Sequence, residues 1–164
     1  GPADAPLAAA WAKARGTYVA SLERLLLHDA LGALWEFVGD ANRFVEAEQP
    51  WALARTAKGE GSDAEAARER LAGVLGDLVE AVRLISLAAA PYLPSIAPRA
   101  LAQLGLEYRY AADGNGGPPL LEELAWGRHA GEPGRLGAPE PLFPRLEVEA
   151  AEAAVDTAVD SAAG

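Results

Sequence analysis

The chain has 164 residues, a length that suits one domain or one domain with a tail. Its 14 Lys and Arg residues are outnumbered by 24 Asp and Glu residues, and the net charge of −10 argues against a basic protein that coats nucleic acid, so we expect no DNA partner. The absence of Cys excludes disulfides and thiolate sites, and with only two His residues far apart we predict no metal site and no cofactor in this chain.

The first third of the chain predicts two long helices and a short one. Apolar side chains recur at helical spacing over residues 6–27, and the expected buried stripe is Leu7, Trp11, Tyr18, Leu22 and Leu25. Asp29 is suited to cap a second helix, whose expected stripe is Leu31, Leu34, Val38, Ala41 and Val45. That helix must end before Pro50, because proline lacks the amide donor, and proline also favours the start of a new short helix over residues 50–55.

A third long helix is predicted between a polar loop at residues 58–61 and Pro91. Ser62 and Glu65 have the spacing of a capping box, in which each side chain bonds the other residue's amide. The expected buried stripe is Leu71, Val74, Leu75, Leu78, Val82, Ile85 and Ala89. We expect the carboxylates Glu65, Glu69 and Glu80 on the solvent face of this helix.

Shorter elements and an acidic tail follow Pro91. Ser95 is placed to cap a helix that runs to Leu104, where Gly105 suits the left-handed closing position. A Gly/Pro loop is expected at 112–119, a helical turn at 120–124 and an irregular stretch at 127–144. Half of the net charge lies in residues 147–164, which contain five acidic side chains and no basic one.

These elements predict an all-α antiparallel helical bundle with an extended C-terminal segment. The bundle is expected over residues 1–111, and a loop, a short helix and the extended segment over residues 112–147. The Ala-rich acidic tail at 148–164 has no large apolar side chain and is expected to be disordered.

Motifs of the common enzyme classes are absent from the sequence. It contains no Gly-x-x-x-x-Gly-Lys-Ser/Thr loop, no Gly-x-Gly-x-x-Gly fingerprint and no Gly-x-Ser-x-Gly elbow. Ser86 and Ser95 have no neighbouring His in the sequence to act as a base. His28 is expected to cap the C-terminus of the first helix, and His129 to be a surface residue. Since these motifs are absent, we expect no catalytic residue in this chain. No run of eighteen apolar residues occurs, so no membrane partner is expected either.

The segment around the proline break combines groups that bind an unpaired base. Asn42, Glu46 and Gln49 share one helix face, and Trp51 and Arg55 lie one turn apart after Pro50. An aromatic ring can stack on a base, amide side chains can bond its edge and a guanidinium can contact phosphate. A Trp at a helix corner can also be a core residue, and the pattern by itself leaves both interpretations open.

These residues resemble a known family, the class I methionyl-tRNA synthetases. The family wording Asn-Arg-Tyr-aliphatic-acid, followed by Pro-Trp-x-x-Ala-Lys, is similar to Asn42-Arg43-Phe44-Val45-Glu46 and Pro50-Trp51-Ala52-Leu53-Ala54-Arg55. Further matches in the same order are Pro91-Tyr92-Leu93-Pro94, Leu104-Gly105 and the closing Pro139-Glu140-Pro141-Leu142-Phe143-Pro144-Arg145. The resemblance covers residues 1–147 and is most specific in the Phe-Pro-Arg ending.

The resemblance implies the helical domain that reads the anticodon loop of the tRNA for methionine. Trp51 corresponds to the residue that stacks on the wobble cytosine of the CAU anticodon, and Pro50 to the residue that sets its orientation. Asn42 and Arg43 match a different family motif, which implies a supporting, structural role. Arg55 stands where Lys is commoner, and we expect it to contact phosphate.

For the whole enzyme the resemblance implies ATP and Mg²⁺, a catalytic domain against which the 112–147 region packs, and a cytoplasmic location. The catalytic motifs of the family, which resemble His-Ile-Gly-His and Lys-Met-Ser-Lys-Ser, do not occur in this sequence. We therefore expect that this chain alone does not make methionyl-tRNA and that it is part of a longer polypeptide. The alternative is a helical scaffold or protein-interaction domain without RNA binding, in which Trp51 fills the core. A related synthetase for another amino acid is disfavoured by the Phe-Pro-Arg ending.

Overall fold

The structure, a computed structural model, describes residues 6–107, 120–127 and 135–143. Its elements are α1 (Pro6–Glu23), α2 (Leu27–Glu48), α3 (Pro50–Thr56), α4 (Ser62–Ala89), α5 (Ile96–Gln103) and α6 (Leu120–Glu123). All regular structure in these three ranges is helical, so the predicted all-α class is confirmed. The predicted loop at 112–119, the tail at 148–164, His129 and Arg145 lie outside the described residues.

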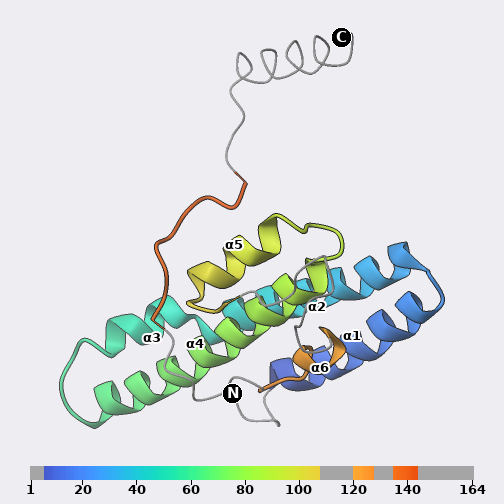
Figure 1. The fold of residues 1–164 in the computed structure, drawn as a ribbon. Helices are drawn as coiled ribbons and strands as arrows, with labels where there is room; N and C mark the ends of the chain where they lie inside the picture. Colours follow the sequence, from blue (N-terminus) through green and yellow to red (C-terminus); the bar gives the residue numbers. More distant parts are fainter. Residues whose placement is uncertain (1–5, 108–119, 128–134, 144–164) are drawn as a thin grey trace, which may run out of the picture.

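Three long helices, α1, α2 and α4, form the body of the bundle (Figure 1). Helix α1 pairs with α2 as a hairpin, and α4 returns antiparallel to α2. Two contacts mark the ends of that antiparallel pair. The Tyr92 hydroxyl, beyond the C-terminus of α4, donates to the Leu27 carbonyl at 2.9 Å, and Arg70 bonds the carboxylate of Glu48 at the other end.

The core lies where α1, α2 and α4 meet. The rings of Trp11 and Phe37 pack with their centroids 4.9 Å apart, and Tyr18 donates its hydroxyl to the Ala88 carbonyl at 2.8 Å. The predicted α1 stripe is confirmed for Leu7, Trp11 and Tyr18, which are all buried. Burial of these large side chains supplies the main stabilising free energy of the bundle.

The buried faces of α2 and α4 agree with the prediction only in part. Of the predicted α2 stripe only Leu34 is fully buried, and its companions in the core are Ala30, Ala33, Phe37 and Phe44. On α4 the predicted Val74 is buried and the predicted Leu78, Ile85 and Ala89 pack against the core, whereas Leu75 and Val82 are 47% and 43% exposed. Both helices carry apolar side chains over most of their circumference, so the neighbouring helices decide which face is buried.

The end of α1 also differs from the prediction. The helix ends at Glu23 instead of continuing to residue 27, because Leu25 adopts a left-handed conformation with φ of 58°. The amides of Leu25 and Leu26 bond the Leu22 and Ser21 carbonyls, which is a Schellman closure with leucine at the position usually held by glycine. Leu25 is consequently 83% exposed and does not join the core.

Three predicted helix caps, at His28, Asp29 and Ser62, are wrong and a fourth is only partly right. Helix α2 begins at Leu27, so His28 and Asp29 lie within its first turn, and His28 does not cap the C-terminus of α1. Helix α4 is preceded by Gly61 and has no side-chain cap bond, so the predicted capping box is not formed. Ser95 does precede α5, but its hydroxyl makes no cap bond either.

A buried ion pair on α4 attaches the short helix α6 to the bundle. Glu80, predicted on the solvent face, is buried and accepts two bonds from Arg83 at 2.8 Å and one from the Gly127 amide at 2.8 Å. Arg83 also donates to the carbonyls of Glu123 and Ala125 at 2.9 and 3.0 Å. The expectation for Glu80 failed because the segment that covers the Glu80–Arg83 pair, including the Gly127 amide, comes about 40 or more residues later in the chain.

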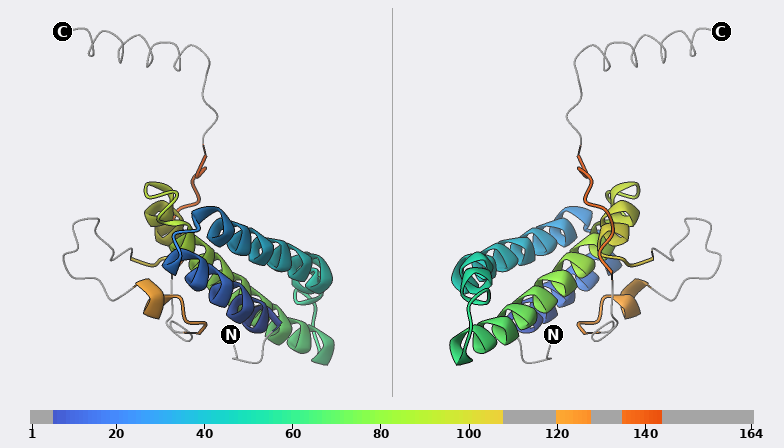
Figure 2. Two further views of the ribbon diagram at one scale, coloured as in Figure 1. Left: turned by 90° about the vertical axis from the view of Figure 1, so that its right-hand side faces the viewer. Right: turned by 90° about the vertical axis from the view of Figure 1, so that its left-hand side faces the viewer.

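Helix α6 confirms the predicted helical turn and lies beside α1 and α4, on the side away from α2 (Figure 2). The indole nitrogen of Trp11 donates to the Leu124 carbonyl at 2.7 Å, and Arg15 donates to the Leu121 carbonyl at 2.9 Å. Leu124 itself is fully buried. This short helix therefore closes one side of the core.

Residues 135–143 form the predicted extended segment and run antiparallel to α5. The Gly137 amide bonds the Gln103 carbonyl at 3.0 Å, and Gln103 and Arg99 donate to main-chain carbonyls at residues 140–142. Gly105 closes α5 with φ of 74°, as predicted. A Cβ on Gly137 would lie 2.4 Å from the Ala102 carbonyl oxygen, so the close approach of the two segments requires glycine there.

Arg83→Met should destabilise the bundle strongly. The substitution leaves the Glu80 carboxylate buried without its cation, which typically costs about 3–5 kcal/mol. Arg70→Met is the matched control, because the Arg70–Glu48 pair is exposed on the arginine side and should contribute at most about 1 kcal/mol. Urea unfolding followed by circular dichroism measures both, and equal losses in the two variants would contradict the role assigned to Arg83.

Stability at alkaline pH should report on Tyr18. Burial, with a smaller contribution from the nearby Tyr92, raises the pKa of the Tyr18 hydroxyl from 10.0 to about 12. Because the folded chain then binds this proton more tightly than the unfolded chain, the stabilisation is complete below about pH 10 and is lost as the pH rises through 12. Urea midpoints between pH 9 and 12 should fall less steeply in Tyr18→Phe than in the wild type, and parallel curves would refute this assignment.

Candidate nucleic-acid interface

The predicted break at Pro50 is confirmed, and Gln49 forms the corner between α2 and α3. Gln49 has a left-handed backbone, with φ of 45° and ψ of 60°, and its amide bonds the Val45 carbonyl at 3.0 Å. Its carbonyl then accepts the amides of Ala52 and Leu53 at 2.8 and 3.2 Å. Gln49 thus ends one helix and begins the next, and Pro50 occupies the first position of α3, where no amide donor is needed.

This corner exposes the indole of Trp51. The side chain is 54% exposed, and none of the residues of α3 is fully buried. Leu53, on the opposite side of α3, packs against the core instead. The alternative in which Trp51 fills the core therefore does not agree with the structure.

The other predicted site residues are divided between two sides of α2 and the exposed side of α3. Asn42 is exposed on α2, together with Glu46 and Gln49, and Arg55 is exposed one turn after Trp51. Arg43 instead forms an ion pair with Asp40 on the side of α2 that faces α1. The structure therefore brings Pro50, Trp51 and Arg55 onto one short helix and leaves Arg43 engaged elsewhere.

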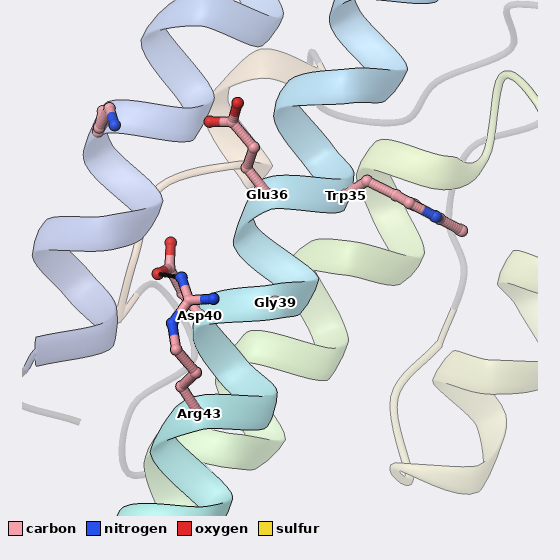
Figure 3. Close-up of a pocket in the computed structure, with 6 residues that line it drawn as sticks. Trp35, Glu36, Gly39, Asp40 and Arg43 are labelled. Atoms are coloured by element: carbon pink, nitrogen blue, oxygen red, sulfur yellow. Dashed lines mark hydrogen bonds and ion pairs between the residues drawn. The ribbon is translucent and has the colours of Figure 1, made fainter.

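The side of α2 that carries Arg43 borders an open depression of about 480 Å³ between α1 and α2 (Figure 3). Lys13 and Arg43 supply two positive charges there, and Glu36 and Asp40 supply two negative ones. Trp35, which lines its rim, points away from these charged side chains. The balanced charge gives an anion no net attraction, so this depression is a poor site for phosphate.

Some cationic side chains around α3 bond other groups of the protein, and others do not. Arg70 is paired with Glu48, and Arg68 donates to the Gly59 carbonyl at 2.8 Å. Arg55 and Lys58 are exposed, and no intramolecular partner of either charged side chain is found among the described residues. Lys58 was not singled out from the sequence, although its spacing of seven residues from Trp51 was a usable signal.

Among the residues that the structure describes, no helix has the length and apolar character needed to cross a bilayer. The same residues contain no group of three or more potential metal-ligating His, Asp or Glu side chains.

The chain is similar to part of known methionyl-tRNA synthetases, although no protein-family model matches it. The methionine–tRNA ligase of Fusobacterium nucleatum is 30% identical over 123 residues, which are 75% of this chain and 17% of that protein. The ligase of Enterococcus faecalis is 25% identical over 148 residues, which are 90% of this chain and 20% of that protein. This chain therefore spans about a fifth of the length of these curated relatives.

Solved structures agree with the sequence relatives. The crystal structure of free Mycobacterium tuberculosis methionyl-tRNA synthetase matches with a TM-score of 0.65 and 28% identity, over 90% of this chain and 26% of that one. The same enzyme in complex with methionyl-adenylate matches with a TM-score of 0.54 and 30% identity, over 83% and 25% of the two chains. The homologues of this chain are methionyl-tRNA synthetases, and it corresponds to a helical part of them.

Gln49→Gly should stabilise the corner. A residue other than glycine is strained in the left-handed region, so the substitution should raise the free energy of unfolding by up to about 1 kcal/mol. Glu46→Gly is the matched control, because the same change inside α2 should cost about 1 kcal/mol. Urea midpoints of the two variants should move in opposite directions, and a loss of stability in both would contradict the left-handed corner.

Proposed function

We propose that this chain is the anticodon-binding part of a methionine–tRNA ligase, and that its ligand is the CAU anticodon loop of the tRNA for methionine. The half-exposed indole of Trp51, held at the corner between α2 and α3, is the observation that carries the proposal. The relatives support the enzyme class, because they are methionine–tRNA ligases. The resemblance of Pro50-Trp51 to the family motif supports the choice of the anticodon.

Stacking of one base on Trp51 is the central contact of the proposed complex. An indole presents a flat apolar face, and stacking of one base on an aromatic side chain typically contributes about 1–3 kcal/mol. Pro50 fixes φ at the first position of α3, and the left-handed Gln49 turns that helix away from α2. These two residues orient the indole, and the exposed Asn42 has a supporting role on the preceding helix.

The acidic character of the chain favours recognition of particular bases over general attraction to phosphate. A net charge of −10 opposes nonspecific binding of RNA. Stacking and hydrogen bonds to base edges in an open loop do not depend on net charge in the same way. We therefore expect selective and weak binding of a CAU loop, with other RNA excluded.

In this proposal the chemistry of the ligase lies outside the chain. Activation of methionine with ATP and Mg²⁺ would take place in a catalytic domain of the same enzyme, which is the second proposed partner. The present sequence holds neither of the nucleotide-binding motifs of that domain. The whole enzyme would act in translation in the cytoplasm.

Trp51→Ala should weaken binding of a CAU stem-loop by about 1–3 kcal/mol, which is a rise in Kd of roughly 5- to 150-fold. Trp35→Ala is the matched control, because Trp35 is also an exposed indole, with 62% of its surface accessible, and it lies on α2 away from the corner. Titration with a fluorescent stem-loop measures Kd, and circular dichroism checks that both variants keep their helices.

Two outcomes would contradict the proposal. An unchanged Kd in Trp51→Ala would exclude stacking on that ring. Equal affinity of the wild type for stem-loops with other anticodons would remove the assignment to methionine.

A further inference from the structure

We infer that Arg55 and Lys58 bind the phosphates of the RNA strand whose base stacks on Trp51, so that the exposed side of α3 is a short track for one strand. The inference rests on the proposed function and adds to it a site for the sugar-phosphate backbone of the RNA. Trp51, Arg55 and Lys58 are spaced i, i+4 and i+7, which places them on one face of a helix.

Helical geometry continues far enough to include Lys58. Helix α3 ends at Thr56, but Ala57 keeps helical dihedrals, with φ of −60° and ψ of −19°. The Ala57 amide bonds the Leu53 carbonyl at 2.8 Å, and the Lys58 amide bonds the Arg55 carbonyl at 3.3 Å. Lys58 therefore stays near the face that carries Trp51 and Arg55, while Leu53 packs inward on the other side.

The dimensions of this face suit a strand that runs along the helix. At the helical rise per residue, Arg55 follows Trp51 by about 6 Å along the axis and Lys58 follows it by about 10.5 Å. If the RNA strand runs from the Gln49 corner toward the α3–α4 loop, a base stacked on the indole would bring the phosphates of that strand beside Arg55 and Lys58. Both side chains are long and end in donors that bond phosphate oxygens.

Three other arginine side chains, on α2 and α4, already bond groups of the protein, so they are less available to bind phosphate. Arg43 is paired with Asp40, Arg70 with Glu48, and Arg68 with the Gly59 carbonyl. Arg55 and Lys58 make no such contact within the described ranges, so no internal bond must break before they bind phosphate. The chain thus offers a small positive site in an acidic protein.

Arg68 is a positioning residue in this arrangement. Its Nη2 donates to the carbonyl of Gly59, the residue directly after Lys58, and so ties the α3–α4 loop to the first turns of α4. Removing this bond frees the backbone that carries Lys58. Arg68 acts through that backbone, and the salt dependence of RNA binding should therefore respond to it.

The salt dependence of binding tests the inference directly. For single strands, log K falls with log salt with a slope of about −0.7 for each phosphate that is neutralised. Two contacts contribute a slope of about −1.4, which is roughly a sevenfold loss of affinity between 50 and 200 mM salt. Arg55→Ala and Lys58→Ala should each reduce the slope by about 0.7, and the double variant by about 1.4.

Matched variants separate a phosphate contact from a general effect of charge. Lys13→Ala and Arg24→Ala remove exposed cations of the α1 region and should leave the slope unchanged. Lys58→Arg keeps a cation and should keep the slope. Trp51→Ala should lower affinity without changing the slope. Arg68→Ala should reduce the slope in part, and Arg68→Lys, which retains a donor for the Gly59 carbonyl, should restore it.

The experiment uses the whole 164-residue chain and a CAU stem-loop. If Trp51→Ala weakens binding while Arg55→Ala and Lys58→Ala leave the slope as in the wild type, the phosphate track is wrong and the proposed function stands. If the slope falls equally in Lys13→Ala and Lys58→Ala, the effect is one of net charge and the track is again wrong. If the wild type does not bind the stem-loop at all, the proposed function fails and the track fails with it.

Discussion

Pro50 has no amide hydrogen, and the direction in which the chain leaves α2 depends on that missing donor. Helix α2 cannot continue through it, Gln49 takes a left-handed conformation, and α3 starts in a new direction. The chain then turns through the α3–α4 loop, and α4 returns antiparallel to α2 to complete the core. The same break leaves the indole of Trp51 exposed at the outer end of the bundle. A backbone constraint at a single residue thus sets the turn between α2 and α3 and the exposure of the candidate site.

The opposite side of the bundle is held by polar bonds in a buried setting. Glu80 and Arg83 satisfy each other and bind the main chain at the C-terminal end of α6 and in the residues directly after it. Buried charges stabilise a fold only when they are fully paired, and here the carboxylate accepts three bonds and the guanidinium donates to two carbonyls besides. The pair therefore fixes the position at which the segment after α5 returns to the bundle. Apolar contacts alone would fix that position less narrowly, because they are not directional.

Few of the positively charged side chains near the corner are available to attract RNA. Most cations near the corner are engaged with carboxylates or a carbonyl, and the acidic side chains outnumber them over the whole chain. In the proposed complex, affinity for RNA would come from a stacked base and from the few cationic side chains that have no partner among the described residues. The proposed selectivity for one anticodon would benefit, because the nonspecific electrostatic contribution is small.

The sequence by itself determined the features that follow from local backbone chemistry. The breaks at Pro50 and Pro91, the closure of α5 at Gly105 and the α1 stripe of Leu7, Trp11 and Tyr18 depend on residues close in the chain, and all are found. Only the tertiary structure decided which apolar residues of α2 and α4 are fully buried and that Glu80 lies inside. Those outcomes depend on neighbours brought together across the bundle, or on a choice between equally apolar helix faces, and spacing along one helix carries no information about either.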